Sequence, residues 1–118
     1  MTLQRGDIVM TRFPHAGGSR GKKRPAVIVQ ADVYNAKLKH FIVAEITTNL
    51  ATASDPASLL IDVATPEGKA TGLDQTSVAC CLFLSTVAEA SITKVIGKLS
   101  ASLKSQLDSC LKIAMELP

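Results

Sequence analysis

Residues 22–30 read KKRPAVIVQ, in which two lysines and an arginine precede a proline and an uninterrupted apolar run. A short apolar run rich in valine and isoleucine is typical of a strand that is buried on both faces. Pro25 has no N–H to donate to a sheet, so we expect it at the first position of a strand over residues 25–30. Four cations therefore stand where a glycine-rich loop enters a buried strand: Arg20, Lys22, Lys23 and Arg24.

The segments on either side of this run predict a mainly β (α+β) chain that ends in a helix. Further strands are expected at 7–13, 41–48, 59–63, 77–84 and 92–99, with loops at 14–23, 50–57 and 64–72 and a turn or short helical piece at 32–37. From Ser100 onward the apolar residues recur every three or four positions, which indicates a helix with Ser100 or Ser102 as its N-cap. Five or six short strands and one terminal helix favour a small, bent antiparallel barrel with the helix packed on it. The 118 residues are enough for one domain, 1–118.

The charge of the chain is unevenly distributed. Residues 1–40 hold eight basic and two acidic side chains, whereas residues 41–118 hold five basic and eight acidic ones, for a net charge of +3. A basic first third indicates phosphate or another polyanion as partner, and a solvated basic face is the alternative. Aromatic residues make up only 3% of the chain. We therefore expect the single tyrosine and the three phenylalanines to be mostly core, and nucleic-acid binding to depend on the phosphate backbone rather than on stacking.

The cysteines and histidines give no indication of a disulfide or a metal site. Cys80 and Cys81 are adjacent and Cys110 stands alone, so we expect three reduced, mostly buried thiols in a cytoplasmic protein. The start of the chain has no signal-peptide pattern, and its longest apolar run, residues 78–84, is too short to span a membrane. His15 and His40 lack metal-ligand spacing, and no metal or cofactor is expected.

Arg24 is the residue best placed to carry chemistry. Pro25 and the strand hold its backbone, and a guanidinium is always charged and donates in bidentate fashion to phosphate. The expected strand at 41–48 ends with Thr47 and Thr48 and is followed by Asn49, which are uncharged donors. If the two strands are antiparallel neighbours, Arg24 and Thr47 meet. The alternative is that Arg24 pairs with an acidic side chain and that the threonines merely suit a strand.

Five motifs in this order resemble the MazF/PemK family of toxins from type II toxin–antitoxin pairs. They are RGDIV (5–9), KKRPAVIVQ (22–30), D-x-Y-N (32–35), AEITTN (44–49) and IGKLS (96–100), which together cover nearly the whole chain. The resemblance implies an SH3-like barrel with a C-terminal helix, and a homodimer. It also implies metal-independent cleavage of single-stranded RNA at short sequences, and silencing by a MazE-like antitoxin whose tail lies across the RNA site.

Carried over by motif, the family's catalytic arginine falls on Arg24 and its active-site threonine on Thr47. The resemblance implies attack of the RNA 2′-hydroxyl on the adjacent phosphorus, release of a 5′-hydroxyl and a 2′,3′-cyclic phosphate product. Arg24 is then expected to stabilise the charge that develops on the phosphoryl oxygens. The residues expected to bind RNA or phosphate are Arg20, Lys22, Lys23, Thr48, Asn49 and Ser77.

The chain also departs from the family pattern. Many members carry an R-x-D pair at positions that correspond roughly to Cys80 and Leu82, and the S-E-Q of some loops is replaced by Ser19-Arg20-Gly21. One alternative is therefore a catalytically weak or inactive homologue that binds RNA or antitoxin only. Another is a CcdB-like toxin that acts by binding a protein target, although such a toxin is expected to end in an aromatic anchor and this chain ends MELP (115–118).

Overall fold

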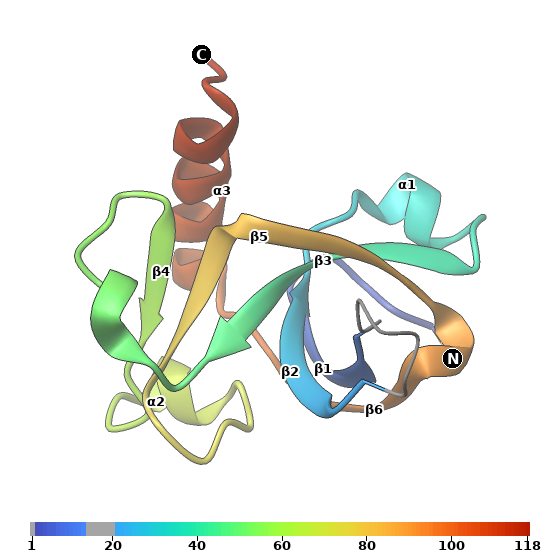
Figure 1. Cartoon of the computed structure of the whole chain (residues 1–118), viewed down its shortest axis with the longest axis horizontal. Helices are drawn as coiled ribbons and strands as arrows, with labels where there is room; N and C mark the ends of the chain where they lie inside the picture. The colour runs from blue at the N-terminus through green and yellow to red at the C-terminus, as the bar shows by residue number, and fades with distance from the viewer. Residues whose placement is uncertain (1, 14–20) are drawn as a thin grey trace.

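A computed structural model of the chain describes residues 2–13 and 21–118. Six strands form one sheet in the order β4-β5-β3-β2-β1-β6, and all neighbouring strands are antiparallel. The sheet is strongly bent, and the C-terminal helix α3 stands against β4 and β5 (Figure 1). The predicted mainly β, barrel-like fold with a C-terminal helix is confirmed. The elements are β1 (Asp7–Arg12), β2 (Lys23–Ile28), α1 (Asp32–Asn35), β3 (His40–Thr47), η1 (Leu50–Thr52), β4 (Ser58–Ile61), α2 (Pro66–Lys69), β5 (Ser77–Ala88), η2 (Glu89–Ser91), β6 (Ile92–Lys98) and α3 (Ala101–Met115).

The central strands bury both of their faces, each in a different core. One core contains Val27 of β2 and Ile46 of β3 and extends to Leu103 and Leu107 of α3. The other lies within the bent part of the sheet, where Ile28 packs with residues from β1, β3, β5 and β6. Successive residues of a strand point to opposite faces. This two-sided burial explains why these strands read as continuous apolar runs rather than as alternating patterns.

Pro25 is not the first residue of its strand, as the sequence suggested. β2 begins at Lys23, and Pro25 pairs with Met10 of β1. The register with β3 begins only at Ala26. At Pro25 the strand therefore has a paired neighbour on one side, where a missing N–H is tolerated as it is in an edge strand.

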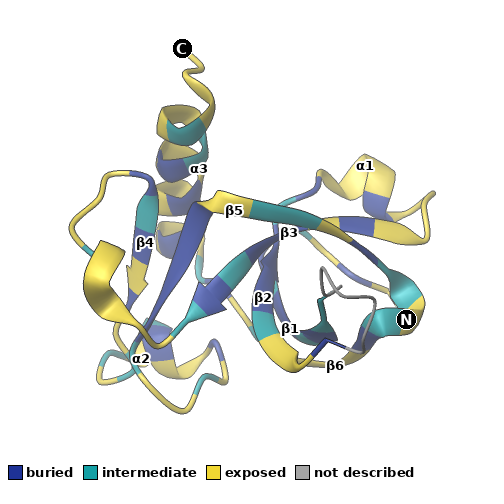
Figure 2. Ribbon diagram, in the orientation of Figure 1, coloured by how far each residue is buried: buried dark blue, intermediate teal, exposed yellow. Residues whose placement is uncertain are grey.

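β5 is longer than predicted and contains a wide bulge. It continues to Ala88 instead of ending at residue 84. Ala44 pairs with Leu84 whereas the next residue of β3, Glu45, pairs with Cys80. Three residues of β5 (81–83) are therefore inserted opposite a single step of β3, and the strand turns its corner there, at the exposed stretch in Figure 2.

The bulge overturns the expectation that the aromatic rings are mostly core. Phe83 is 60% exposed and Tyr34 is 54% exposed. Only Phe41 is buried as expected, while Phe13 is half-buried against the second core. The sequence does not reveal this difference because Phe83 stands inside an apolar run that reads as buried throughout.

The three cysteines are free and buried, as predicted. Cys81 packs in the core with Cys110 of α3, while the adjacent Cys80 faces the other side of the sheet. Burial raises the pKa of the Cys81 thiol to about 12, with smaller contributions from Cys110 and Cys80. The pKa of Cys110 is raised as well, first by burial and then by Asp55.

These raised pKa values predict that the two core thiols do not react in the folded protein, because the thiolate is the nucleophile. In a Cys80→Ser variant at pH 8, Ellman's reagent is expected to label Cys81 and Cys110 only after unfolding in urea. Labelling of two thiols per chain before urea is added would contradict the buried placement.

Ser100 rather than Ser102 is the N-cap of α3. Its hydroxyl accepts the N–H of Leu103 at 3.1 Å and donates to a carboxylate oxygen of Glu67 at 2.8 Å. We expect Ser100→Ala to lower the free energy of unfolding by about 1 kcal/mol, as the loss of a cap does in other helices. Ser102→Ala is the matched control two residues away, and urea unfolding of both variants checks the difference. Equal losses would contradict the assignment.

Candidate functional site

Arg24 and Thr47 lie side by side at the ends of two neighbouring strands. The pairing of β2 with β3 ends at Ala26 opposite Glu45, and Arg24 and Thr47 each lie two residues beyond that pair. Side chains two positions apart share a face of the sheet. Arg24, Glu45 and Thr47 accordingly line one shallow pocket of about 240 Å³, together with Cys80 and Phe83 of β5. We call it the Arg24 pocket.

Glu45 is the acidic partner of Arg24. A guanidinium nitrogen lies 3.4 Å from a Glu45 carboxylate oxygen, and the two side chains are 50% and 32% exposed. An exposed pair of this kind contributes only about 0–1 kcal/mol. The alternative that Arg24 pairs with an acidic side chain is therefore confirmed for the protein without a ligand. It still leaves the guanidinium free to exchange this weak partner for a phosphate.

The other polar group in the Arg24 pocket is the Thr47 hydroxyl. Its oxygen accepts the backbone N–H of Asn49 at 3.1 Å, so the hydroxyl proton remains available to a ligand. Asn49 in turn caps η1, because its side-chain oxygen accepts the N–H of Ala51 at 3.0 Å. These two hydrogen bonds fix the chain just after β3 and hold Thr47 in place beside Arg24.

A second, smaller pocket adjoins the first. It measures about 150 Å³ and shares Thr47, Cys80 and Phe83 with the Arg24 pocket. Asn49 and Thr52 add their polar side chains to its wall. We call it the Asn49 pocket. The predicted phosphate-binding residue Asn49 thus lies next to Arg24 and Thr47, but in a separate hollow.

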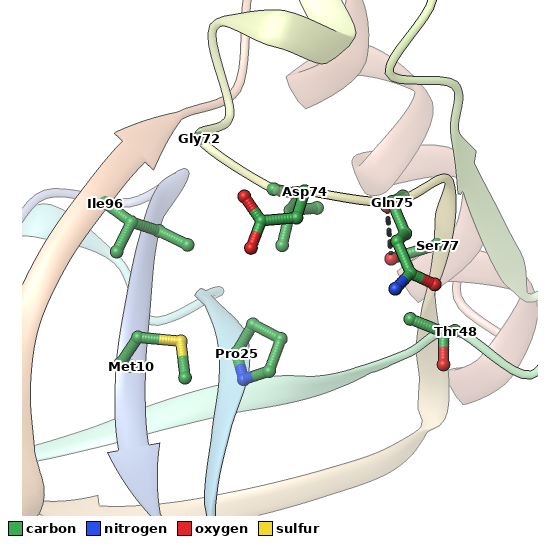
Figure 3. A pocket seen from close by; sticks show the side chains of 9 residues that line it. Met10, Pro25, Thr48, Gly72, Asp74, Gln75, Ser77 and Ile96 are labelled. Carbon is green, nitrogen blue, oxygen red and sulfur yellow. Dashed lines mark hydrogen bonds between the residues drawn. The ribbon is translucent and has the colours of Figure 1, made fainter.

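Thr48 and Ser77 lie in a third cavity, away from Arg24. This cavity of about 210 Å³ is also lined by Pro25, and the carboxylate of Asp74 faces it (Figure 3). The Ser77 hydroxyl is buried and donates to the backbone oxygen of Gln75 at 2.7 Å. Among the described residues that line this cavity none is basic, so it is less suited to phosphate than the Arg24 pocket is. The structure does not bring Thr48 and Ser77 together with the other predicted site residues.

The remaining predicted contacts are cations at the entrance of β2. Lys22 and Lys23 are exposed and precede Arg24, but they line none of the three pockets. They precede Arg24 in the sequence as exposed positive charges, which attract an anion to this end of the sheet. Arg20 lies outside the described residues.

Glu45, Cys80 and Phe83 are site residues that the sequence analysis missed. Strand alternation was a sufficient signal for Glu45, since it precedes Thr47 by two positions and shares its face. The resemblance gave a signal for Cys80, which corresponds roughly to a position of the family's R-x-D pair and lies opposite Glu45 in the sheet. Phe83 has no such signal, because it lies in the bulge of β5.

Two kinds of feature are absent from the described part of the chain, residues 2–13 and 21–118. No group of three or more histidine, cysteine, aspartate or glutamate side chains there is arranged to hold a metal ion. No helix in those ranges is long and apolar enough to cross a membrane.

Known proteins are similar to this chain over nearly its whole length. It is 30% identical to the endoribonuclease MazF6 of Mycobacterium tuberculosis over 119 residues, which covers 99% of this chain and all of that protein. It is 28% identical to the endoribonuclease EndoA of Bacillus subtilis, over 99% of this chain and 97% of EndoA.

Solved structures agree in fold. The Mycobacterium tuberculosis toxin MazF-mt6 superposes with a TM-score of 0.77 at 25% identity, over 95% of this chain and 98% of that one. One chain of a MazE–MazF crystal structure from Deinococcus radiodurans superposes with a TM-score of 0.76 at 15% identity, over the whole of this chain and the whole of that one. At this identity the likeness is one of fold alone. The family model described as PemK-like, MazF-like toxin of type II toxin–antitoxin systems matches residues 4–115, so the chain belongs to this family of toxins.

Proposed function

We propose that this protein is the toxin of a toxin–antitoxin pair and cleaves single-stranded RNA at the Arg24 pocket, without a metal ion. The placement of Arg24 and Thr47 in one pocket carries the proposal. Two relatives that match 99% of this chain's length are named endoribonucleases, which supports the same reaction class. The site of action is then the cytoplasm, where messenger RNA is translated.

The reaction begins when an RNA phosphate enters the Arg24 pocket. Arg24 then gives up its ion pair with Glu45 and donates to two phosphoryl oxygens instead. The neighbouring 2′-hydroxyl attacks phosphorus, the 2′-oxygen–phosphorus bond forms and the bond to the 5′-oxygen breaks. A 2′,3′-cyclic phosphate remains on one fragment. Arg24 stabilises the extra negative charge of the pentavalent state, and Thr47 donates its hydroxyl proton to orient the phosphate.

Glu45 is placed to accept the proton of the 2′-hydroxyl. It is the carboxylate among the described residues lining the Arg24 pocket, and an arginine with a pKa above about 12 is a poor base at neutral pH. The released 5′-oxygen takes its proton from water, and Glu45 returns its own proton to the solvent. Glu45 thus supplies an acidic group that Cys80 and Leu82, at the positions of the family's R-x-D pair, do not.

Two partners follow from family membership. We infer a MazE-like antitoxin that blocks the Arg24 pocket, supported by the fold likeness to the MazF chain of a MazE–MazF complex. We also infer a homodimer. An acidic antitoxin segment is complementary to the cations at the start of β2, because it presents carboxylates where the RNA presents phosphates.

The removal of Arg24 tests the proposed reaction. In buffer with EDTA, the purified protein is expected to cut a long single-stranded RNA and to leave 5′-hydroxyl ends, whereas Arg24→Ala loses about 100-fold or more in cleavage rate. Lys22→Ala is the comparison: it removes a neighbouring cation that lines no pocket, so RNA affinity is expected to fall while the single-turnover rate at saturating protein is kept. Replacing the ribose at the cleaved position by deoxyribose is expected to stop the reaction, because the nucleophile is lost.

Two results would contradict this proposal. Cleavage that survives Arg24→Ala would place the site elsewhere. RNA that stays intact but bound would identify an inactive homologue, one of the alternatives that the sequence left open.

The variant Glu45→Gln tests the proton acceptor separately. Glutamine keeps the size of the side chain and a hydrogen bond to Arg24 but cannot take a proton, so cleavage is expected to slow by about 100-fold while RNA affinity is kept or raised. If Glu45 serves only as the resting partner of Arg24, the variant will cleave at least as fast as the wild type. Single-turnover rates together with binding measurements distinguish these results.

A further inference from the structure

Phe83 is exposed at a place where the fold gives it no packing role. It is in the three-residue bulge of β5, is 60% exposed, and belongs to neither core. Leu82 beside it is 56% exposed. A large apolar ring that is displayed in this way loses the stabilisation that burial would give it. An exposed aromatic ring beside polar groups is typical of a binding surface.

The ring borders both pockets of the site. Phe83 lines the Arg24 pocket with Glu45 and Thr47, and it also lines the Asn49 pocket. Thr47 and Cys80 are the other two residues that the pockets share. A phosphate held by Arg24 therefore has the aromatic ring next to it, on the side of the Asn49 pocket.

The Asn49 pocket offers hydrogen-bond donors at the other end. The side-chain oxygen of Asn49 is occupied by the N–H of Ala51, which fixes the amide and directs its function towards donation from the nitrogen. The hydroxyl of Thr52, also in this wall, can donate or accept. An apolar ring face with a few fixed polar groups at its edge is the combination by which proteins bind an unstacked RNA base.

We propose that Phe83 is the stacking surface for the RNA base next to the phosphate in the Arg24 pocket, with Asn49 at the edge of that base. The inference rests on the proposed function for its substrate, single-stranded RNA. It makes Phe83 a determinant of affinity and sequence preference rather than a catalytic residue. It also replaces the expectation, drawn from the low aromatic content, that stacking plays little part.

The bulge supplies its own control, because Leu82 is the neighbour of Phe83, is similarly exposed and lines neither pocket. The probe is a fluorescein-labelled single-stranded RNA with 2′-O-methyl groups throughout, which has no nucleophile and stays intact. Fluorescence anisotropy measures its affinity for the full chain. Phe83→Ala and Phe83→Leu are expected to weaken binding about tenfold, within the range measured for base stacking. Phe83→Tyr and Leu82→Ala are expected to stay within about twofold, since they keep the ring.

A second arm locates the base. Once the cleaved phosphate has been mapped on unmodified RNA, the methylated probe is made with an abasic site on either side of that phosphate. If Phe83 stacks on one of these bases, the wild type binds the probe without that base about tenfold more weakly than the complete probe. Phe83→Ala, which has no ring to stack, is then expected to bind the two probes equally well.

The outcomes separate this inference from the function on which it rests. If the wild type binds the methylated probe but leaves unmodified RNA intact, the proposed cleavage is overturned. The affinities of the Phe83 variants for the probe still test stacking in that case. Leucine at position 83 that binds as well as phenylalanine would overturn stacking. A change in molecular mass on sedimentation for Phe83→Ala and Phe83→Leu would overturn it too, because the ring would then be a contact between copies of the chain.

Discussion

The burial of both faces of β2 and β3 is the constraint on which the rest of the structure depends. Ala26, Val27 and Ile28 are all inaccessible to solvent, because alternate side chains enter the two cores. Such a strand has little room for polar side chains at its centre, so they lie towards its ends: Arg24 in β2, and Glu45 and Thr47 in β3. Burial declines from Ala26 to a half-buried Pro25 and an exposed Arg24 within two residues. The guanidinium therefore has a backbone held by a rigid sheet and a side chain in water, which is the combination that binding a phosphate in a defined place requires.

Two kinds of residue make up the family motifs, and the structure separates them. In RGDIV, Arg5 contacts Asp108 of α3 at 2.7 Å and donates to the backbone oxygen of Val29 at 3.0 Å. In D-x-Y-N, the buried Asn35 bonds to Gln30, and the N–H of Arg5 lowers the pKa of Asp32 by hydrogen bonding. In IGKLS, a Cβ at Gly97 would collide with the backbone carbonyl of Thr71, so the position admits only glycine. These motifs join the sheet to its helix and loops. Two motifs reach the site: KKRPAVIVQ through Arg24, and AEITTN through Glu45, Thr47 and Asn49.

The sequence predicted the barrel-like class, six strands, the terminal helix and the neighbouring positions of Arg24 and Thr47, because all of these follow from local patterns and from antiparallel pairing. It did not predict that Thr48 and Ser77 face a different cavity, although alternation along β3 already places Thr48 opposite Thr47. It could not predict the bulge at 81–83, because that depends on the register between β3 and β5 over a separation of about forty residues. An insertion of that kind leaves no mark in hydrophobic periodicity, and Phe83 consequently read as core.

The residues proposed for cleavage lie near the ends of β2 and β3, whereas the residue proposed to select a base lies in the bulge of β5. This separation relates RNA cleavage to sequence preference. Arg24 pairs with Thr11 of β1, Glu45 with Ala26 of β2 and Thr47 with Val78 of β5, so a change that moves these backbones disturbs the pairing and packing of the sheet. Leu82 and Phe83 are outside both cores, and substitutions there cost little stability. A chain built in this way keeps its phosphate chemistry constant while the residue beside it changes. In related toxins with the same fold, different residues at the corner of β5 would then select different bases, and sequence preference would vary without loss of the barrel.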